Sequence, residues 1–400
     1  MLFRLDCLRD NESIELFFDT LDCCVTSRDG KVLNEQILEP SKSTILPFSE
    51  SENPNGINRD AHQLEIILGL KCNLRCSYCN QQSFRNNVHS SSLEDVPHFL
   101  KRFDDLGIKP KVVRFGGGEP LVYWDVFKAL VIDIRDRIPE VAFFTITNAT
   151  LLDDEKLDFI KKHRINITVS ADGLTPRGAS NILVDSKLML QKAAKKLGPL
   201  LRFSAVLTNQ TPDVMLVREQ IQDAIGGSPI FSCCPLKLRS KDGDVLTEEA
   251  SQKISQSVFE ALYDGWDGGV RKSHIEGFVR ALLSRARLAD VRSDYCPYNC
   301  GNILTDLKWS AFRCHTEPKP LGTIDALPMS LPSVGGDWTQ RKNCSRCAYI
   351  HMCKGFCPSL EGDARKLSCE YISAFWLGAF RYVFGSLFGV YVEKISPIEQ

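Results

Sequence analysis

The stretch Cys72-Asn73-Leu74-Arg75-Cys76-Ser77-Tyr78-Cys79 places three thiols in a Cys-x3-Cys-x2-Cys loop. It directly follows an apolar run, residues 64–70, which predicts a short buried strand. A cubic iron–sulfur cluster with four thiolate ligands is coordinatively full, whereas three thiolates leave one iron open to a ligand that is not protein. Structural zinc needs four protein ligands, and no histidine or fourth cysteine lies close by in the sequence. The spacing therefore favours an iron–sulfur cluster with an open iron over zinc.

A glycine-rich motif, Phe115-Gly116-Gly117-Gly118-Glu119-Pro120, follows a second predicted strand at residues 112–115. Together the two motifs resemble the radical S-adenosylmethionine (radical SAM) enzymes. The resemblance implies that Cys72, Cys76 and Cys79 hold a [4Fe-4S] cluster whose open iron chelates S-adenosylmethionine. It also implies that Tyr78 fills the aromatic position before the last cysteine. Gly117, Gly118 and Glu119 would approach the methionine closely, because glycine lacks a Cβ.

Strands and helices alternate through this part of the chain. Apolar periodicity and turn residues predict strands at 64–70, 112–115, 141–147, 165–170, 200–207 and 229–236, with helices at 92–106, 122–137, 153–163, 182–197 and 213–225 between them. Such repeats predict parallel strands joined by right-handed crossovers, hence an α/β fold. The pattern alone does not separate a barrel from an open doubly wound sheet. The resemblance implies a partial (β/α)6 barrel, with functional loops beyond the C-terminal strand ends.

Polar residues follow two of these strands. Asn148 comes after the strand at 141–147, and Ser170 ends the strand at 165–170. By resemblance both are candidate contacts for S-adenosylmethionine, and Arg177 is a candidate for its carboxylate, although the sequence around Arg177 departs from the usual family pattern. Ordinary turn chemistry is the alternative explanation, because Asn, Asp and Gly end strands in many proteins.

A second group of cysteines lies near the C-terminus, in the spacing Cys344-x2-Cys347-x5-Cys353-x3-Cys357. With the cysteines at 296, 300, 314 and 369 it resembles the SPASM extension of radical SAM maturases. By resemblance, Cys296, Cys300, Cys314 and Cys357 would hold one auxiliary cluster, and Cys344, Cys347, Cys353 and Cys369 a second, which makes three [4Fe-4S] clusters in all. Disulfides are the competing explanation, but they do not persist in a reducing compartment.

The predicted organisation has five parts. Residues 1–60 form a small β-rich extension, a candidate contact for a leader peptide by strand addition, with a linker-like stretch at 50–58. The partial barrel occupies 61–240, a helical bridge 241–295, the SPASM domain 296–372 and a C-terminal amphipathic helix 373–400.

Composition and net charge limit which partners and which cellular compartment are expected. A formal net charge of −1 provides no basic field for nucleic acid. The N-terminus lacks the basic start and apolar core of a secretory signal, which favours a cytoplasmic protein with reduced thiols. The apolar stretch 374–392 contains Arg381, which would cost about 2.5–3.5 kcal/mol within a membrane, so a packed helix is expected rather than a span. A weak membrane contact is the alternative.

The resemblance implies a peptide-modifying oxidoreductase. A 5′-deoxyadenosyl radical would abstract hydrogen from a side chain of a ribosomally made precursor peptide, with electrons from a donor such as flavodoxin or ferredoxin, and an oxidative crosslink (cyclophane, C–C or ether) would form. A formylglycine-forming or thioether-forming maturase is the alternative enzyme, and a non-catalytic iron–sulfur carrier or scaffold the alternative from another class. The sulfatase-maturing branch has an Asp after the third cysteine of the first auxiliary cluster. His315 stands there in this chain, a candidate proton acceptor that departs from that pattern.

Overall fold

The structure is a computed structural model, and it describes residues 1–35, 62–84, 86, 88–236, 245–266, 269, 272–288, 302–312, 314–315, 318–324, 341–357 and 360–398. The linker-like stretch at 50–58 and the candidate ligands Cys296 and Cys300 lie outside these residues.

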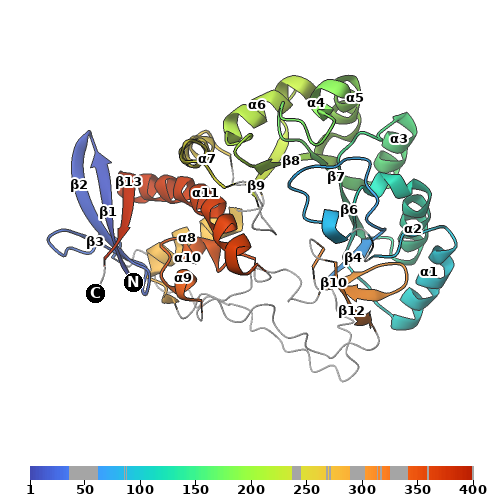
Figure 1. Cartoon of the computed structure of the whole chain (residues 1–400), viewed down its shortest axis with the longest axis horizontal. Coiled ribbons are helices and arrows are strands. Elements are labelled where there is room, and N and C mark those ends of the chain that lie inside the picture. Colours follow the sequence, from blue (N-terminus) through green and yellow to red (C-terminus); the bar gives the residue numbers. More distant parts are fainter. Residues whose placement is uncertain are drawn as a thin grey trace.

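A nine-stranded sheet forms the larger half of the molecule (Figure 1). Its order is β12-β11-β10-β4-β5-β6-β7-β8-β9, and the six strands β4 to β9 lie side by side in chain order, each parallel to the next. Their bounds are β4 Gln63–Ile67, β5 Val112–Gly116, β6 Ala142–Thr147, β7 Ile165–Ser170, β8 Leu201–Leu207 and β9 Ile230–Pro235. A doubly wound sheet reverses its strand order at a central switch point, whereas β4 to β9 follow one another without a reversal. The α/β fold is thus confirmed, and the strand order is that of a partial barrel.

Helices cover one face of the curved sheet, on the outside of the arc (Figure 1). They are α1 Asp95–Leu106, α2 Trp124–Arg137, α3 Asp154–Lys162, α4 Ile182–Asp185, α5 Lys187–Leu197 and α6 Val214–Ile225. Two predictions here were wrong in detail. The helix expected from residue 92 begins at Asp95, after Glu94, and the helix expected at 182–197 breaks at Ser186.

The two faces of the parallel strands differ in character. Along β7, Ile165, Ile167 and Val169 are buried, while the alternate residues Asn166 and Thr168 are only half-buried. Parallel strands covered on both faces are usually continuous apolar runs. Along β7 the apolar positions face the helices and polar residues face the barrel interior, whereas β6 places Phe144 and Ile146 on that inner face.

Three more strands extend the sheet beyond β4. They are β10 Asn302–Thr305, parallel to β4, then β11 Ser310–Phe312 and β12 Pro320–Thr323, both antiparallel to their neighbours. This brings the segment with Cys314 and His315 to the open side of β4.

A second, four-stranded sheet joins both ends of the chain, in the order β13-β1-β2-β3. The bounds are β1 Leu2–Arg9, β2 Glu12–Asp19, β3 Cys24–Ser27 and β13 Tyr391–Pro397. The sequence predicts strands at 13–18 and 23–26, which correspond to β2 and β3, but not β1. It missed β13 because the partner of this strand, β1, lies at the opposite end of the chain.

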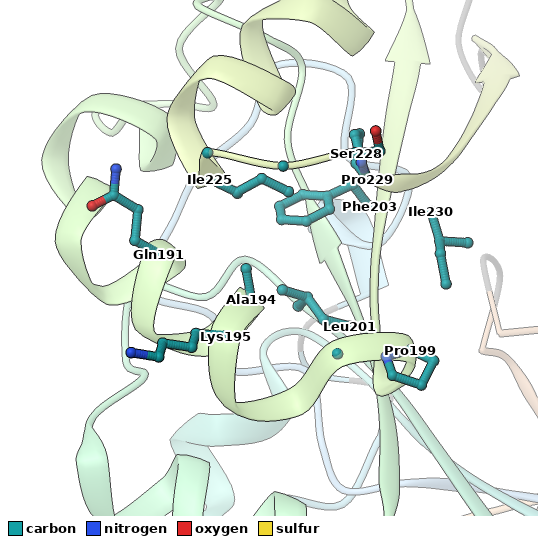
Figure 2. A pocket seen from close by; sticks show the side chains of 13 residues that line it. Gln191, Ala194, Lys195, Pro199, Leu201, Phe203, Ile225, Ser228, Pro229 and Ile230 are labelled. Atoms are coloured by element: carbon teal, nitrogen blue, oxygen red, sulfur yellow. The ribbon is translucent and has the colours of Figure 1, made fainter.

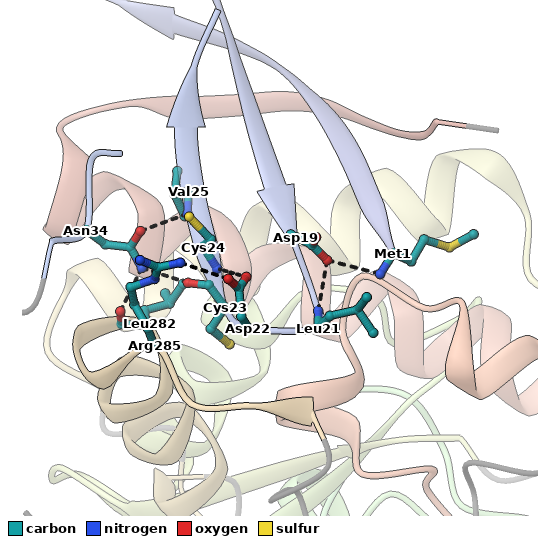
Figure 3. A network of polar contacts seen from close by, with 10 residues as sticks. All are labelled: Met1, Asp19, Leu21, Asp22, Cys23, Cys24, Val25, Asn34, Leu282 and Arg285. Carbon is teal, nitrogen blue, oxygen red and sulfur yellow. Dashed lines mark hydrogen bonds and ion pairs between the residues drawn. The ribbon is translucent and has the colours of Figure 1, made fainter. Parts of the chain in front are cut away.

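The N-terminal sheet is tied to the C-terminal half, so residues 1–35 do not form a separate piece. Asn34 donates to the carbonyl oxygens of Cys23 and of Leu282, both at 2.7 Å, and Arg285 pairs with Asp22 at 2.8 Å (Figure 3). Leu282 belongs to α8 Lys272–Ser284, which with α7 Glu248–Tyr263 forms the expected helical stretch after the barrel.

The C-terminal helix differs from its prediction in extent. α11 spans Gly362–Phe388, and residues 391–397, expected as helix, form β13. Its middle is buried around most of its circumference rather than along one stripe, so the helix is not amphipathic. Arg381 donates to Val392 O at 2.8 Å and to Ser255 Oγ at 2.8 Å. Within the described chain, no helix is both long and apolar enough to cross a membrane.

Close packing of α11 on α7 depends on Gly378. A Cβ there would lie 2.3 Å from Ser255 O and 2.8 Å from Val258 Cβ, whereas a Cβ at Gly385 in the same helix would meet only Val390 O, at 3.7 Å. We expect Gly378→Ala to destabilise the protein by about 1–3 kcal/mol through overpacking. Gly385→Ala, the control, should be neutral or stabilise by up to about 1 kcal/mol, from helix propensity. Urea midpoints measure both, and equal midpoints would show that α11 can shift freely on α7.

Candidate active site

The cysteine loop begins directly beyond the C-terminal end of β4. Burial raises the pKa of the Cys72 and Cys76 thiols, so both prefer the neutral form unless a positive partner is bound. Besides burial, the charges of Cys76 and Cys79 contribute to raising the pKa of the Cys72 thiol. Among the described residues no three ligand side chains converge on one point, so the ligand set stays a prediction.

The Gly-Gly-Glu turn is pressed against the backbone that enters this loop. Gly118 N donates to Gly69 O and Glu119 N to Lys71 O, both at 3.0 Å. A Cβ on Gly118 would lie 2.4 Å from Lys71 O, and one on Gly117 (φ +128°) 2.1 Å from Gly69 O. Only glycine fits either position, and the expected close approach of backbone is therefore present.

Glu119 points into the protein rather than toward open space. Its side chain is buried and accepts hydrogen bonds from Leu121 N (3.0 Å), Thr147 Oγ1 (2.7 Å) and Asn148 N (2.7 Å). Burial raises the pKa of this carboxyl against the opposing effect of the three donors. The carboxylate thus fastens the turn after β5 to the end of β6, and Oε2, with one of these donors, keeps acceptor capacity for a ligand.

Asn148 lies beside the cysteine loop, as predicted for a residue at the end of β6. Its Nδ2 is 2.9 Å from Asn73 Oδ1 and 3.9 Å from Cys72 Sγ. Its Oδ1 accepts from Thr150 Oγ1 at 2.7 Å. Ser170 is the last residue of β7, half-buried at the same rim of the sheet.

Arg177 reaches back to the cysteine loop and is held by Asp172. The guanidinium lies 3.2 Å from Asp172 Oδ1 and 5.3 Å from the centre of the Tyr78 ring, and its charge opposes the rise in the pKa of the Cys76 thiol that burial causes. The Tyr78 hydroxyl donates to the same carboxylate, and Val206 N donates to it at 2.9 Å. The Asp172 carboxylate, central to this arrangement, was not among the predicted site residues. The Ser-Ala-Asp-Gly turn was the available signal, and it is equally typical of an ordinary turn.

A second missed residue, Glu65, faces the barrel interior. Gly116 shares its face of the sheet, and a Cβ there would lie 3.1 Å from Glu65 Oε1. His315 Nδ1 is 3.8 Å from the same oxygen, and Gln81 donates to His315 O at 2.8 Å. The segment after β11 therefore lies against both β4 and the cysteine loop. A single charge inside the buried run of residues 64–70 was the overlooked signal.

The described C-terminal cysteines gather around two short helices, α9 Lys342–Ser345 and α10 Ile350–Cys353, and the start of α11. The charges of Cys344 and Cys369 act on Cys347, and burial raises the pKa of that thiol to about 12. Arg365 Nη2 is 3.6 Å from Cys344 Sγ. Two other members of the predicted second auxiliary set thus act electrostatically on Cys347, and Arg365 lies beside Cys344. That these residues hold a cluster stays a prediction. Of the first set only Cys314 and Cys357 are described.

A separate pocket of about 460 Å³ lies at the other end of the sheet (Figure 2). It is formed by α5, the start of β8 and the turn between α6 and β9, and it contains no predicted site residue. Active sites of barrels built from parallel strands lie at the opposite, C-terminal rim.

Sequence comparison identifies the domain around the cysteine loop. The profile described as the radical SAM superfamily matches residues 66–197. The chain contains a radical SAM domain. The GTP 3′,8-cyclase of Clostridium perfringens (strain SM101 / Type A) is 32% identical over 120 residues, 29% of this chain and 36% of that protein. The probable GTP 3′,8-cyclase of Methanocaldococcus jannaschii is 34% identical over 122 residues, 30% of this chain and 39% of that protein. The chain thus matches little more than a third of the length of these relatives.

Solved structures resemble the chain well beyond the radical SAM domain. Native anSMEcpe with bound AdoMet aligns with a TM-score of 0.58 at 18% identity, covering 82% of this chain and 99% of that one. Native anSMEcpe with bound AdoMet and Cp18Cys peptide aligns with a TM-score of 0.56 at 17% identity, covering 82% and 99%. At this identity the likeness concerns the fold. The cofactors that a radical SAM domain implies are a [4Fe-4S] cluster and S-adenosylmethionine, and the three-cluster count stays a prediction.

The turn of the radical SAM domain offers a direct test of its close backbone approach. In Gly118→Ala the added methyl group would overlap Lys71 O and break the two backbone hydrogen bonds that dock the turn. We expect S-adenosylmethionine to bind the reconstituted protein at least about tenfold more weakly, since one lost anchoring contact of about 1.4 kcal/mol suffices for that. Equilibrium dialysis measures the affinity.

Gly277→Ala is the matched control, because a Cβ at Gly277 has nothing within 4 Å. Unchanged affinity in Gly118→Ala would show that the turn does not support the cofactor.

Proposed function

We propose that the protein is a cytoplasmic radical SAM maturase that forms an oxidative crosslink (cyclophane, C–C or ether) in a ribosomally made peptide. The observation that carries the proposal is the extent of the structural likeness to anSMEcpe, a protein crystallised with AdoMet and a peptide. It covers 82% of this chain and 99% of that one, far more than residues 66–197. The C-terminal thiols, in SPASM-like spacing, support the same type of enzyme.

The residues of the chain fit the cofactor pair. When bound, the cluster and S-adenosylmethionine supply a 5′-deoxyadenosyl radical that abstracts hydrogen from an unactivated C–H bond. Cys72, Cys76 and Cys79 would hold the cluster at the rim of the barrel. The docked glycine turn and Glu119 would receive the methionine amine, and Arg177 is the cation nearest to this loop among the predicted residues.

The barrel interior would orient the target side chain. Asn166, Thr168 and Ser170 of β7 are half-buried on the inner face, so a peptide group entering from the rim would meet hydrogen-bonding partners along this strand. Arg114, on the same face as Glu65, lies over the Phe144 ring at 5.9 Å. A buried carboxylate and a guanidinium therefore flank the space beneath the glycine turn.

In this proposal the auxiliary sets accept the electron that the oxidised peptide must give up, and a donor such as flavodoxin or ferredoxin reduces the first cluster. Fully thiolate-ligated clusters have no open iron for substrate, which suits electron transfer. His315, adjacent to Cys314 and facing Glu65, is placed to accept the proton that leaves with the electron.

Leader binding by residues 1–60 remains a prediction, and the described edges of the N-terminal sheet are covered. The outer edge of β3 bonds with residues 31–33, through Ser27 N to Lys31 O and Leu33 N to Val25 O. At the other edge, Arg381 occupies Val392 O. Natural sheets block edges in this way against added strands. A leader added to this sheet would have to displace one of these contacts.

A second candidate function follows from the relatives named GTP 3′,8-cyclase, whose identity of 32–34% exceeds that of the structural neighbours. Formylglycine or thioether formation on a peptide is a third, and a non-catalytic iron–sulfur carrier a fourth. The substrate arms of one assay separate action on a precursor peptide, on a sulfatase peptide and on GTP. A thioether also removes two hydrogens from a precursor peptide, so alkylation of its free thiols distinguishes a thioether from a C–C or ether crosslink.

The assay combines reduced, reconstituted protein and S-adenosylmethionine with one of three substrates. These are a peptide encoded next to its gene, a sulfatase peptide with Cys or Ser, and GTP. We expect 5′-deoxyadenosine and a peptide lighter by two hydrogens in the first arm only, measured by mass spectrometry. A nucleotide product from GTP would refute the maturase proposal, and no 5′-deoxyadenosine in any arm would favour the carrier.

Removing one thiol of the cysteine loop tests the cluster assignment. Cys76→Ala should abolish 5′-deoxyadenosine while retaining the iron of the auxiliary sets, because their ligands lie elsewhere in the chain. Iron content and absorbance measure the retained clusters. Cys7→Ala is the control, since Cys7 lies buried in β1, far from the barrel in the sequence and in the fold. Complete loss of iron in Cys76→Ala would show that the assignment is wrong.

A further inference from the structure

Arg177 packs against the cysteine loop as a buried cation. The Arg177 side chain is 16% exposed, and its Nε is buried without a hydrogen-bond partner among the described residues. Its Nη1 donates to both Asp172 oxygens, and the guanidinium lies over the ring of Tyr78, two residues after Cys76. The Arg177 charge also opposes the rise in the pKa of the Cys76 thiol that burial causes. Buried polar groups are normally hydrogen-bonded. The unpartnered Nε of Arg177 can therefore donate to one further acceptor that the described residues do not supply.

Asp172 fixes this arrangement from several directions. The carboxylate, 1% exposed, accepts from Arg177 at 3.2 and 3.3 Å, from the Tyr78 hydroxyl, and from Val206 N at 2.9 Å. β7, β8 and the cysteine loop therefore meet at one side chain. Gly178, the next residue after Arg177, packs against the backbone of Arg75, with a virtual Cβ 3.1–3.3 Å from its atoms. The guanidinium is held in place at both its tip and its base.

We propose that Arg177 donates a hydrogen bond to the Cys76 thiolate of the bound cluster and raises the reduction potential of that cluster, and that Asp172 is the residue that positions it. The inference rests on the proposed function only in that a [4Fe-4S] cluster binds Cys72, Cys76 and Cys79.

The physical reason is the charge change on reduction. One electron enters the cluster and no atom is transferred, so the reduced form carries one more negative charge, spread over iron, sulfide and thiolate. Hydrogen bonds to the sulfurs and nearby positive charge stabilise that form more than the oxidised one, which raises the potential. Partners of the ligands, rather than the ligands alone, commonly set such properties.

The competing destination for Arg177 is the carboxylate of S-adenosylmethionine, with which a guanidinium can form a bidentate pair. That role requires the cofactor, whereas a bond to Cys76 acts on the cluster alone. Measuring the potential without S-adenosylmethionine therefore separates the two roles.

The experiment is a dithionite titration of the full-length reconstituted protein, followed by electron paramagnetic resonance, without S-adenosylmethionine. The same titration of a variant with Cys72, Cys76 and Cys79 all changed to Ala is subtracted, which leaves the signal of the cluster in question. We expect Arg177→Gln to lower the ratio of reduced to oxidised cluster about tenfold at a fixed potential, or about 59 mV for one electron. Arg177→Lys should give a ratio between those of the unchanged protein and Arg177→Gln, because lysine keeps the positive charge but lacks the planar guanidinium group.

Arg75→Gln is the matched control, since it removes an equal charge from an exposed side chain of the same loop. It should leave the ratio within about twofold, as solvent screens exposed charges. If Arg75→Gln shifted the reduction potential as much as Arg177→Gln, the effect would come from net charge and not from a bond to Cys76. That result would overturn the inference.

Asp172→Asn gives a test by sign. Removing a negative charge near the cluster would by itself raise the potential, whereas release of Arg177 from Cys76 lowers it. We expect a lower potential, and a higher one would show that Asp172 does not position Arg177. If Arg177→Gln titrates like the unchanged protein but binds S-adenosylmethionine more weakly, the guanidinium serves the carboxylate and the inference fails. If the triple cysteine variant retains all its clusters, the proposed function itself fails.

Discussion

The site depends on one close approach of backbone to backbone, between the turn after β5 and the exit of β4. Gly117 and Gly118 lie so near to Gly69 and Lys71 that no side chain fits between them, and two hydrogen bonds of 3.0 Å close the contact. The approach fixes where the cysteine loop starts. It also gives the buried Glu119 a defined position, from which its carboxylate ties the end of β6 to the same turn. Three consecutive strand ends thus share one rigid rim.

The end of β7 is connected to this rim by charged side chains. Asp172 follows β7, accepts from Val206 on β8, and through Arg177 and Tyr78 reaches the cysteine loop again. The cysteine loop is therefore held from both sides, by Asn148 at the end of β6 and by Arg177 after β7. Burial opposes ionisation of the Cys72 and Cys76 thiols. The positive charge of a bound iron–sulfur core would stabilise their thiolate forms and so offset this effect.

The sequence was sufficient for the barrel and the cysteine loop, but not for their surroundings. Strand and helix periodicity, with caps such as Gly107, recovered β4 to β9 within one to three residues, because each unit is local in the chain. The pairing of β1 with β13 joins opposite ends of the chain, and no local pattern records it. Asn148 and Arg177 were predicted from family motifs. Asp172 and Glu65 act through partners far away in sequence, so a short turn and one charge in an apolar run were ambiguous signals.

The distribution of polarity across the sheet separates stability from function. The outer face supplies the apolar core under the helices, as in the contact of Phe115 with Phe127 at 4.7 Å between ring centres. The inner face of the same strands is free of that task and carries Glu65, Arg114 and Asn166 in one row of neighbouring residues, completed by Phe144. Burying charged groups is costly for folding unless they are paired and hydrogen-bonded. Asn166 donates to Phe143 O at 3.2 Å and the Arg114 guanidinium lies over the Phe144 ring, so neighbouring strands anchor this row. The sheet therefore carries its charged groups on the face that the apolar core beneath the helices does not use.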